Sequence, residues 1–73
     1  KITIKNVIPT VVLSVREVEI LEQLSLGMTN KVIAERLFIS PFTVKRHIEN
    51  IYQKLQAHNR IDLIEKAKKE KLI

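Results

Sequence analysis

Apolar side chains recur at the spacing of one helical face between Ser40 and Leu55. On a helix of 3.6 residues per turn, one narrow stripe collects every third or fourth residue, and this stripe comprises Val44, Ile48, Ile51 and Leu55. The opposite side carries charged or polar groups and one aromatic ring, namely Phe42, Lys45, Arg46, Glu49 and Gln53. Ser40 is a preferred N-cap and Pro41 suits the first helical position. The pattern therefore predicts a helix over residues 41–56 with a buried back and a polar front.

Three further helices are predicted from apolar positions that follow capping residues. Ser14 and Glu17 form a capping-box pattern, and Gly27 is suited to end the helix that they begin. Thr29 caps a short helix to about Phe38, and Asn59 caps a fourth helix, with Asp62 as a box-like partner. We therefore predict an all-α fold of four helices. One shared core is expected to contain the following residues: Ile33, Leu37, Val44, Ile48, Ile51 and Leu55.

Length and composition fit one small globular domain. The chain has 73 residues, of which 45% are hydrophobic and 29% charged, and both fractions are ordinary for a globular protein. There is no cysteine, which excludes disulfides and thiolate metal sites, and no apolar run reaches membrane-spanning length. We interpret residues 1–12 as a linker or N-terminal extension, or a short edge strand, before a domain over residues 13–73. Because the chain begins with Lys1 rather than Met, we expect it to be a fragment of a larger protein.

The net charge of +5 is unevenly distributed along the chain. Residues 14–26 hold one cation and three acids, a net of −2, whereas residues 27–58 hold five cations and two acids, a net of +3. An acidic element followed by basic ones suggests that one side of the molecule faces a polyanion. If only the charge is considered, a mildly basic surface exposed to solvent explains it as well as a surface that binds a polyanion.

The second and third predicted helices, joined by a tight turn, have the layout of a helix-turn-helix. The major groove of DNA is about 12 Å wide and admits one α-helix. Lys45 and Arg46 supply hydrogen-bond donors for base edges, and Arg can bond guanine at two atoms. Glu49 could accept from cytosine or pair with Lys45 on its own helix. Thr43, with Asn30 and Lys31 at the start of the second helix, suits backbone phosphates.

The matching stretches LSVREVEIL, GMTNKVIAERLFISPFTVKRHIENIYQKL and NR resemble the LuxR-type (GerE-type) DNA-binding domain of bacterial transcription regulators. The resemblance extends over residues 13–73 and implies four helices, of which the third enters the major groove of double-stranded DNA. It implies base-facing positions for Lys45, Arg46 and Glu49, and phosphate contacts for Asn30, Lys31 and Thr43. The fourth helix often mediates dimerisation in this family. Its broad apolar arc makes four residues candidates for a homodimer surface, namely Ile61, Leu63, Ile64 and Ala67.

The resemblance also implies a cytoplasmic output domain, as in response regulators, with RNA polymerase as a further candidate partner. The chain departs from the family pattern at three positions. The family commonly has Glu where this chain has Val32, Gly-Val where it has Gln56 and Ala57, and Gly where it has Lys71. The second departure leaves open where the third helix ends and the fourth begins.

Two other functions compete with a regulator that binds a specific DNA sequence. A promoter-reading domain like those of sigma factors shares the helix-turn-helix, and a small interaction module could use the fourth helix. Enzymatic activity lacks a basis, because there is no nucleophile–base–acid set and Gly27 is the only glycine. His47 lies at the margin of the apolar stripe, where we expect a packed side chain, and we predict neither a metal site nor a cofactor.

Overall fold

The computed structural model describes residues 12–73, which form four α-helices and no strand. The helices are α1 (Val15–Ser25), α2 (Asn30–Leu37), α3 (Pro41–Leu55) and α4 (Arg60–Lys69). The prediction of an all-α, four-helix fold is confirmed, and each helix starts directly after its predicted cap. Except for Val12, the predicted linker or edge strand lies outside the described residues.

Local side-chain hydrogen bonds account for the starts of the helices. In the capping box of α1, the Glu17 backbone N–H donates to Ser14 Oγ at 3.1 Å, and the Ser14 N–H donates to Glu17 Oε1 at 2.9 Å. Ser40 Oγ accepts from the Thr43 N–H in the same way at the start of α3. At α4 the predicted box is shifted, because the Asp62 carboxylate accepts from the His58 N–H and not from the Asn59 N–H. This bond is the main reason that the pKa of Asp62 is lowered.

A residue in the left-handed conformation ends or follows each of the four helices, the last being Lys71 at φ 59° after α4. Gly27, at φ 85°, takes the conformation expected of a glycine after α1. Phe38 and Gln56 end α2 and α3 at φ 59° and 53°, although neither is a glycine. Gln56 stands where the LuxR-type pattern has Gly, so α3 ends at the expected place despite the substitution. A bulky residue such as Phe38 in this region is a genuine outlier and stores strain.

The core joins side chains from all four helices. Its buried members are Ile20, Leu21, Leu24, Ile33, Ala34, Val44, Ile51, Leu55, Leu63 and Ala67. Two expected core members, Leu37 and Ile48, pack against this cluster but are only partly buried. At 100° per residue, Ile48 lies about 40° from Val44 around α3, toward the flank that also carries the partly buried Tyr52. The buried stripe of α3 is therefore narrower than predicted.

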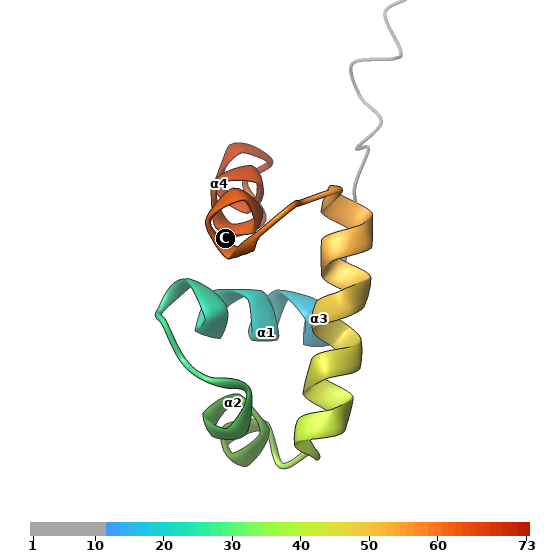
Figure 1. The fold of residues 1–73 in the computed structure, drawn as a ribbon, viewed down its shortest axis with the longest axis vertical. Helices are drawn as coiled ribbons and strands as arrows, with labels where there is room; N and C mark the ends of the chain where they lie inside the picture. Colours follow the sequence, from blue (N-terminus) through green and yellow to red (C-terminus); the bar gives the residue numbers. More distant parts are fainter. Residues whose placement is uncertain (1–11) are drawn as a thin grey trace, which may run out of the picture.

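Helix α3 contacts each of the other three helices. In Figure 1 it runs along one side of the molecule, with α4, α1 and α2 beside its successive turns. Helix α1 lies between α4 and α2 and also contacts α4. Because burying one Ile or Leu side chain contributes about 1.5–3 kcal/mol, Val44, Ile51 and Leu55 hold α3 firmly on this scaffold. The opposite face of α3 is left to the solvent.

Candidate nucleic-acid interface

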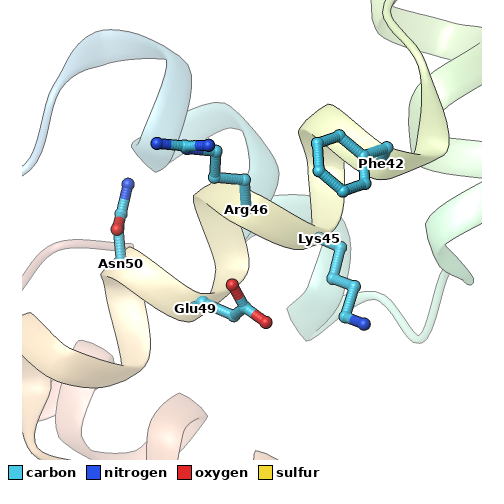
Figure 2. A pocket seen from close by; sticks show the side chains of 5 residues that line it. All are labelled: Phe42, Lys45, Arg46, Glu49 and Asn50. Atoms are coloured by element: carbon cyan, nitrogen blue, oxygen red, sulfur yellow. The ribbon is translucent and has the colours of Figure 1, made fainter.

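The outward face of α3 forms a shallow surface hollow lined by five side chains of that helix: Phe42, Lys45, Arg46, Glu49 and Asn50. Figure 2 shows these side chains projecting from successive turns of α3. All five are exposed. The hollow gathers the three residues that sequence analysis assigned to bases, which are Lys45, Arg46 and Glu49. It adds Phe42 and Asn50, whose position on the outer side or flank of the helix was visible in the sequence but was not interpreted as functional.

The charges in this hollow are free to meet a ligand. The ion pairs among residues 12–73 are Arg16–Glu19, Lys54–Glu17 and Lys66–Asp62, so none of them involves this face of α3. The alternative pairing of Glu49 with Lys45 is therefore not formed. Two cations and one carboxylate in a row give the surface both hydrogen-bond donors and an acceptor, which is the chemistry needed to distinguish base edges.

The start of α2 offers a second polar surface. Asn30 and Lys31 occupy its first two helical positions and are exposed, and Thr29 Oγ1 accepts from the Val32 N–H at 3.3 Å. Val32 carries no side-chain group that could complete a capping box. Helix N-termini attract anions through their free N–H groups and dipole. Asn30 and Lys31 do not line the hollow on α3, so the two polar surfaces are separate.

Thr43 has a structural contact that sequence analysis did not predict. Its hydroxyl lies 2.9 Å from Ser40 Oγ, and its backbone N–H donates to the same oxygen. The side chain is only partly exposed. Thr43 therefore helps to close the first turn of α3 through both its hydroxyl and its backbone N–H.

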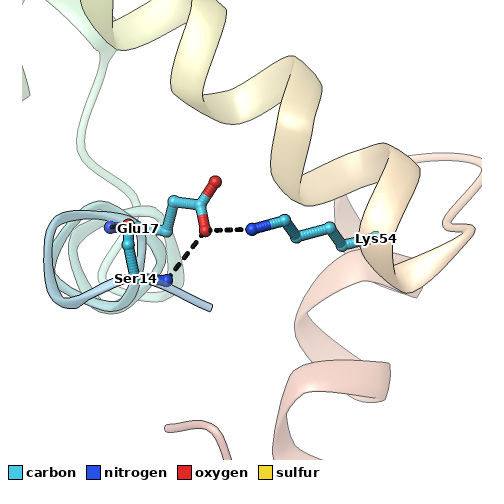
Figure 3. Close-up of polar contacts among 3 residues, drawn as sticks. All are labelled: Ser14, Glu17 and Lys54. Carbon is cyan, nitrogen blue, oxygen red and sulfur yellow. Dashed lines mark hydrogen bonds and ion pairs between the residues drawn. The ribbon is translucent and has the colours of Figure 1, made fainter. Parts of the chain in front are cut away.

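A partly buried ion pair joins α3 to α1 (Figure 3). Lys54 Nζ lies 2.8 Å from Glu17 Oε1, and the Glu17 side chain is only 6% exposed. Burial raises the pKa of Glu17, but the hydrogen bond from Lys54, the Ser14 bonds and the Lys54 charge outweigh it and leave the pKa below its ordinary value. Glu17 thus stays charged in the fold and orients the C-terminal half of α3.

A second polar link orients the loop that leads into α2. Arg60 Nη2 donates to the carbonyl oxygen of Leu24 at 2.8 Å and to that of Met28 at 3.1 Å. The start of α4 is thereby joined to the end of α1 and to the segment before Thr29. Charge-assisted bonds of this kind are the stronger hydrogen bonds in proteins. They hold in place the loop from which Asn30 and Lys31 emerge.

The apolar arc of α4 divides between the core and the surface. Leu63 and Ala67 are fully buried, whereas Ile64 is partly buried and Ile61 is 73% exposed. This burial corrects the expected dimer surface, because a side chain sealed in the core of its own chain has no surface left for a partner. Of the four candidate residues, only Ile61 and Ile64 have exposed apolar surface for a partner.

The described residues contain no group of three or more His, Cys, Asp or Glu side chains that could hold a metal ion. His47 is partly exposed at the edge of the buried stripe. Within residues 12–73, every helix is too short or too polar to cross a membrane.

Comparison with known proteins identifies the family. The family described as GerE, "Bacterial regulatory proteins, luxR family", matches residues 11–67. The chain is 50% identical over 62 residues to the Fimbriae Z protein of Escherichia coli K12, covering 85% of this chain and 30% of that protein. It is 46% identical over 65 residues to the oxygen regulatory protein NreC of Staphylococcus carnosus, covering 89% of this chain and again 30% of the relative.

A solved structure agrees with the sequence relatives. The fold matches the crystal structure of the response regulator ChrA, of a heme-sensing two-component system, with a TM-score of 0.82 and 44% identity. The match covers 96% of this chain and 35% of ChrA. The chain thus spans about a third of the length of the proteins it resembles. It belongs to the LuxR family of bacterial regulatory proteins, as a DNA-binding helix-turn-helix domain.

Proposed function

We propose that this domain binds a specific DNA sequence by laying α3 in the major groove, as the output domain of a larger bacterial response regulator. The observation that carries the proposal is the outward face of α3, where Lys45, Arg46 and Glu49 are exposed beside one another and form no ion pair with residues 12–73. Family membership supports this function over a sigma-factor-like domain or an interaction module. The domain acts by binding and not by catalysis.

Base reading falls to exposed side chains on the outward face of α3. Arg46 bonds guanine through two parallel hydrogen bonds, and Lys45 donates to a neighbouring acceptor. Glu49, one turn farther along α3, accepts from a cytosine amine. Because a carboxylate is repelled by phosphates, Glu49 also discriminates against sequences that offer it no donor.

Phosphate contacts fall to Asn30, Lys31 and Thr43, which fix the position of the domain on the duplex. The exposed N-terminus of α2 supports this role for Asn30 and Lys31. Thr43 has its hydroxyl close to Ser40 in the free chain, so its contact with phosphate uses the remaining lone pairs or a rotated hydroxyl.

The partners of the whole regulator follow from the same proposal. Two copies bind one operator through the exposed part of α4, with Ile61 and Ile64 at the contact, and the bound regulator acts on RNA polymerase. Since bacterial DNA lies in the cytoplasm, we place the protein there. Residues 1–12 then serve as the linker or N-terminal extension before the domain of residues 13–73.

The test separates base reading from phosphate binding. A duplex is selected from a randomised pool with the wild-type chain, and its affinity is compared with that of random duplex at several salt concentrations. Arg46→Ala should cost about 1–3 kcal/mol on the selected duplex and much less on random duplex. Lys31→Ala should weaken both duplexes alike and lower the salt slope by about one.

Lys69→Ala is the matched control, because Lys69 is an exposed cation at the end of α4 that lies outside both polar surfaces and away from the side of α4 that carries Ile61 and Ile64. It should leave the ratio of selected to random affinity unchanged. Equal losses on both duplexes for Lys45→Ala and for Arg46→Ala would show that this face touches only the DNA backbone, and the base-reading assignment would be abandoned.

A further inference from the structure

The ring of Phe42 is exposed to solvent on the outward face of α3, in the first turn of that helix. Phe42 is 72% exposed and lines the same hollow as Lys45, Arg46, Glu49 and Asn50 (Figure 2). A single exposed apolar side chain needs no explanation by itself. What distinguishes Phe42 is its place, because it is the apolar member of an otherwise polar hollow.

The packing of the domain gives Phe42 no structural role. The residues that pack against the core from α3 lie on its other side, and they are Val44, Ile48, Ile51, Tyr52 and Leu55. Phe42 belongs neither to the core nor to the partly buried side chains around it. Its removal therefore should not open a cavity, and any effect on DNA binding should reflect a contact with DNA.

Base edges in the major groove include one apolar group, the C5-methyl of thymine, which an aromatic side chain can contact. In helix-turn-helix proteins the first residues of the recognition helix contact base edges. Phe42 is the second residue of α3, after Pro41. Phe42 therefore belongs to the part of α3 that contacts base edges when this helix lies in the groove.

We propose that Phe42 reads the C5-methyl group of a thymine and so adds a specificity-determining contact beyond the charged residues of α3. This inference rests on the proposed function, since it requires α3 in the major groove. The contact is apolar and carries no charge, so it discriminates among sequences without changing the salt dependence of binding.

The helix geometry also predicts where the thymine lies. Phe42 and Arg46 are four residues apart, which is about 6 Å along the helix axis. Successive bases on one strand are about 3.4 Å apart along the duplex. Because the groove winds around the duplex axis, a helix lying along it passes at most this many base pairs, so the thymine should be within about two base pairs of the guanine that Arg46 contacts.

The test removes only the methyl group. In the duplex selected with the wild-type chain, each thymine is replaced in turn by deoxyuridine, which pairs identically with adenine but lacks the methyl. One position per half-site should lose affinity about threefold to fourfold, the loss expected for one apolar group returned to water. In Phe42→Ala the same replacement should change affinity less than about 1.5-fold, because the apolar partner of the methyl is gone.

Two further variants are compared on the same thymine and deoxyuridine duplexes. Phe42→Leu keeps an apolar side chain and should retain much of the methyl sensitivity. Phe38→Ala is the matched control, because Phe38 is 93% exposed but belongs to the turn before α3 and not to the hollow. Phe38→Ala should lose as much affinity as wild type when thymine is replaced by deoxyuridine. Thermal unfolding followed by circular dichroism verifies that each variant is folded.

Two results would overturn the inference while leaving the proposed function intact. One is a selected duplex in which wild type shows no methyl-sensitive position, and the other is an unchanged methyl sensitivity in Phe42→Ala. If the pool yields no enriched sequence at all, the proposed function fails and this inference fails with it.

Discussion

The ion pair between Lys54 and Glu17 ties α3 to α1, and the structure limits how much its loss can cost. A hydrogen bond to a charged group contributes about 1.5–3 kcal/mol. Lys54 is 42% exposed, so water screens it and reduces this figure, whereas Glu17 is nearly buried and cannot be rehydrated without movement. Lys54→Met keeps the aliphatic part of the side chain and removes the charge. We expect it to lower the free energy of unfolding by about 1–2 kcal/mol.

The pH dependence of stability gives this prediction a second readout. The pKa of Glu17 is lower in the fold than its ordinary value of 4.5, so the unfolded chain binds more protons in acid. The stabilisation from Glu17 is complete above pH 4.5 and is lost as the pH falls through the lowered folded pKa. In Lys54→Met, burial of the carboxylate is less well compensated and the folded pKa rises. The gap between the unfolded and folded pKa of Glu17 narrows, so the variant should lose less stability than wild type as the pH falls below 4.5.

Urea unfolding between neutral pH and acid measures both effects. Lys45→Met is the matched control, because it removes one cation from the exposed face of the same helix without breaking an ion pair to residues 12–73. It should change stability by less than about 0.5 kcal/mol. If Lys54→Met unfolds at the same urea concentration as wild type with the same acid response, the pair does not hold α3 in solution.

Three further predictions follow from burial and backbone geometry. Phe38→Gly should stabilise the fold by about 1 kcal/mol in urea unfolding, because glycine takes the left-handed conformation without strain; a loss of stability would refute this account. Ile51→Ala should cost about 2–5 kcal/mol and the partly buried Ile48→Ala distinctly less, so equal losses would contradict the observed burial. Ile61→Asp should weaken the binding of a second copy to operator DNA in sedimentation without changing the fold, and unchanged two-copy binding would exclude Ile61 from the dimer contact.

Sequence analysis predicted the helices well because their start signals are local. Ser14, Thr29, Ser40 and Asn59 each cap the helix that follows, through a bond to a backbone N–H three residues on. Such bonds depend on residues that are neighbours in the chain, so they can be recognised before any packing is known. The polar face of α3 was predictable for the same reason, since helical periodicity alone separates Lys45 and Arg46 from the buried stripe.

Features that depend on contacts between distant segments were not predicted. Glu17 was recognised as a capping residue, but its partner Lys54 is 37 positions away and follows only from the crossing of α1 and α3. The arc on α4 was seen as one apolar surface, whereas packing against the core buries Leu63 and Ala67 and leaves Ile61 outside. Sequence spacing shows which residues share a side of a helix, but the neighbouring helices decide how much of that side is covered.

The same contacts change how the net charge should be interpreted. Of the five cations in residues 27–58, Lys54 is paired with Glu17, and Arg36 Nη1 lies 3.5 Å from the Met28 sulfur. Just beyond that range, Arg60 is bonded to backbone carbonyls of α1 and the following loop. Much of the positive charge therefore stabilises the scaffold. The salt dependence of DNA binding reports the cations that release counterions from phosphate, so it should follow substitutions at Lys31 far more closely than the formal charge of the chain.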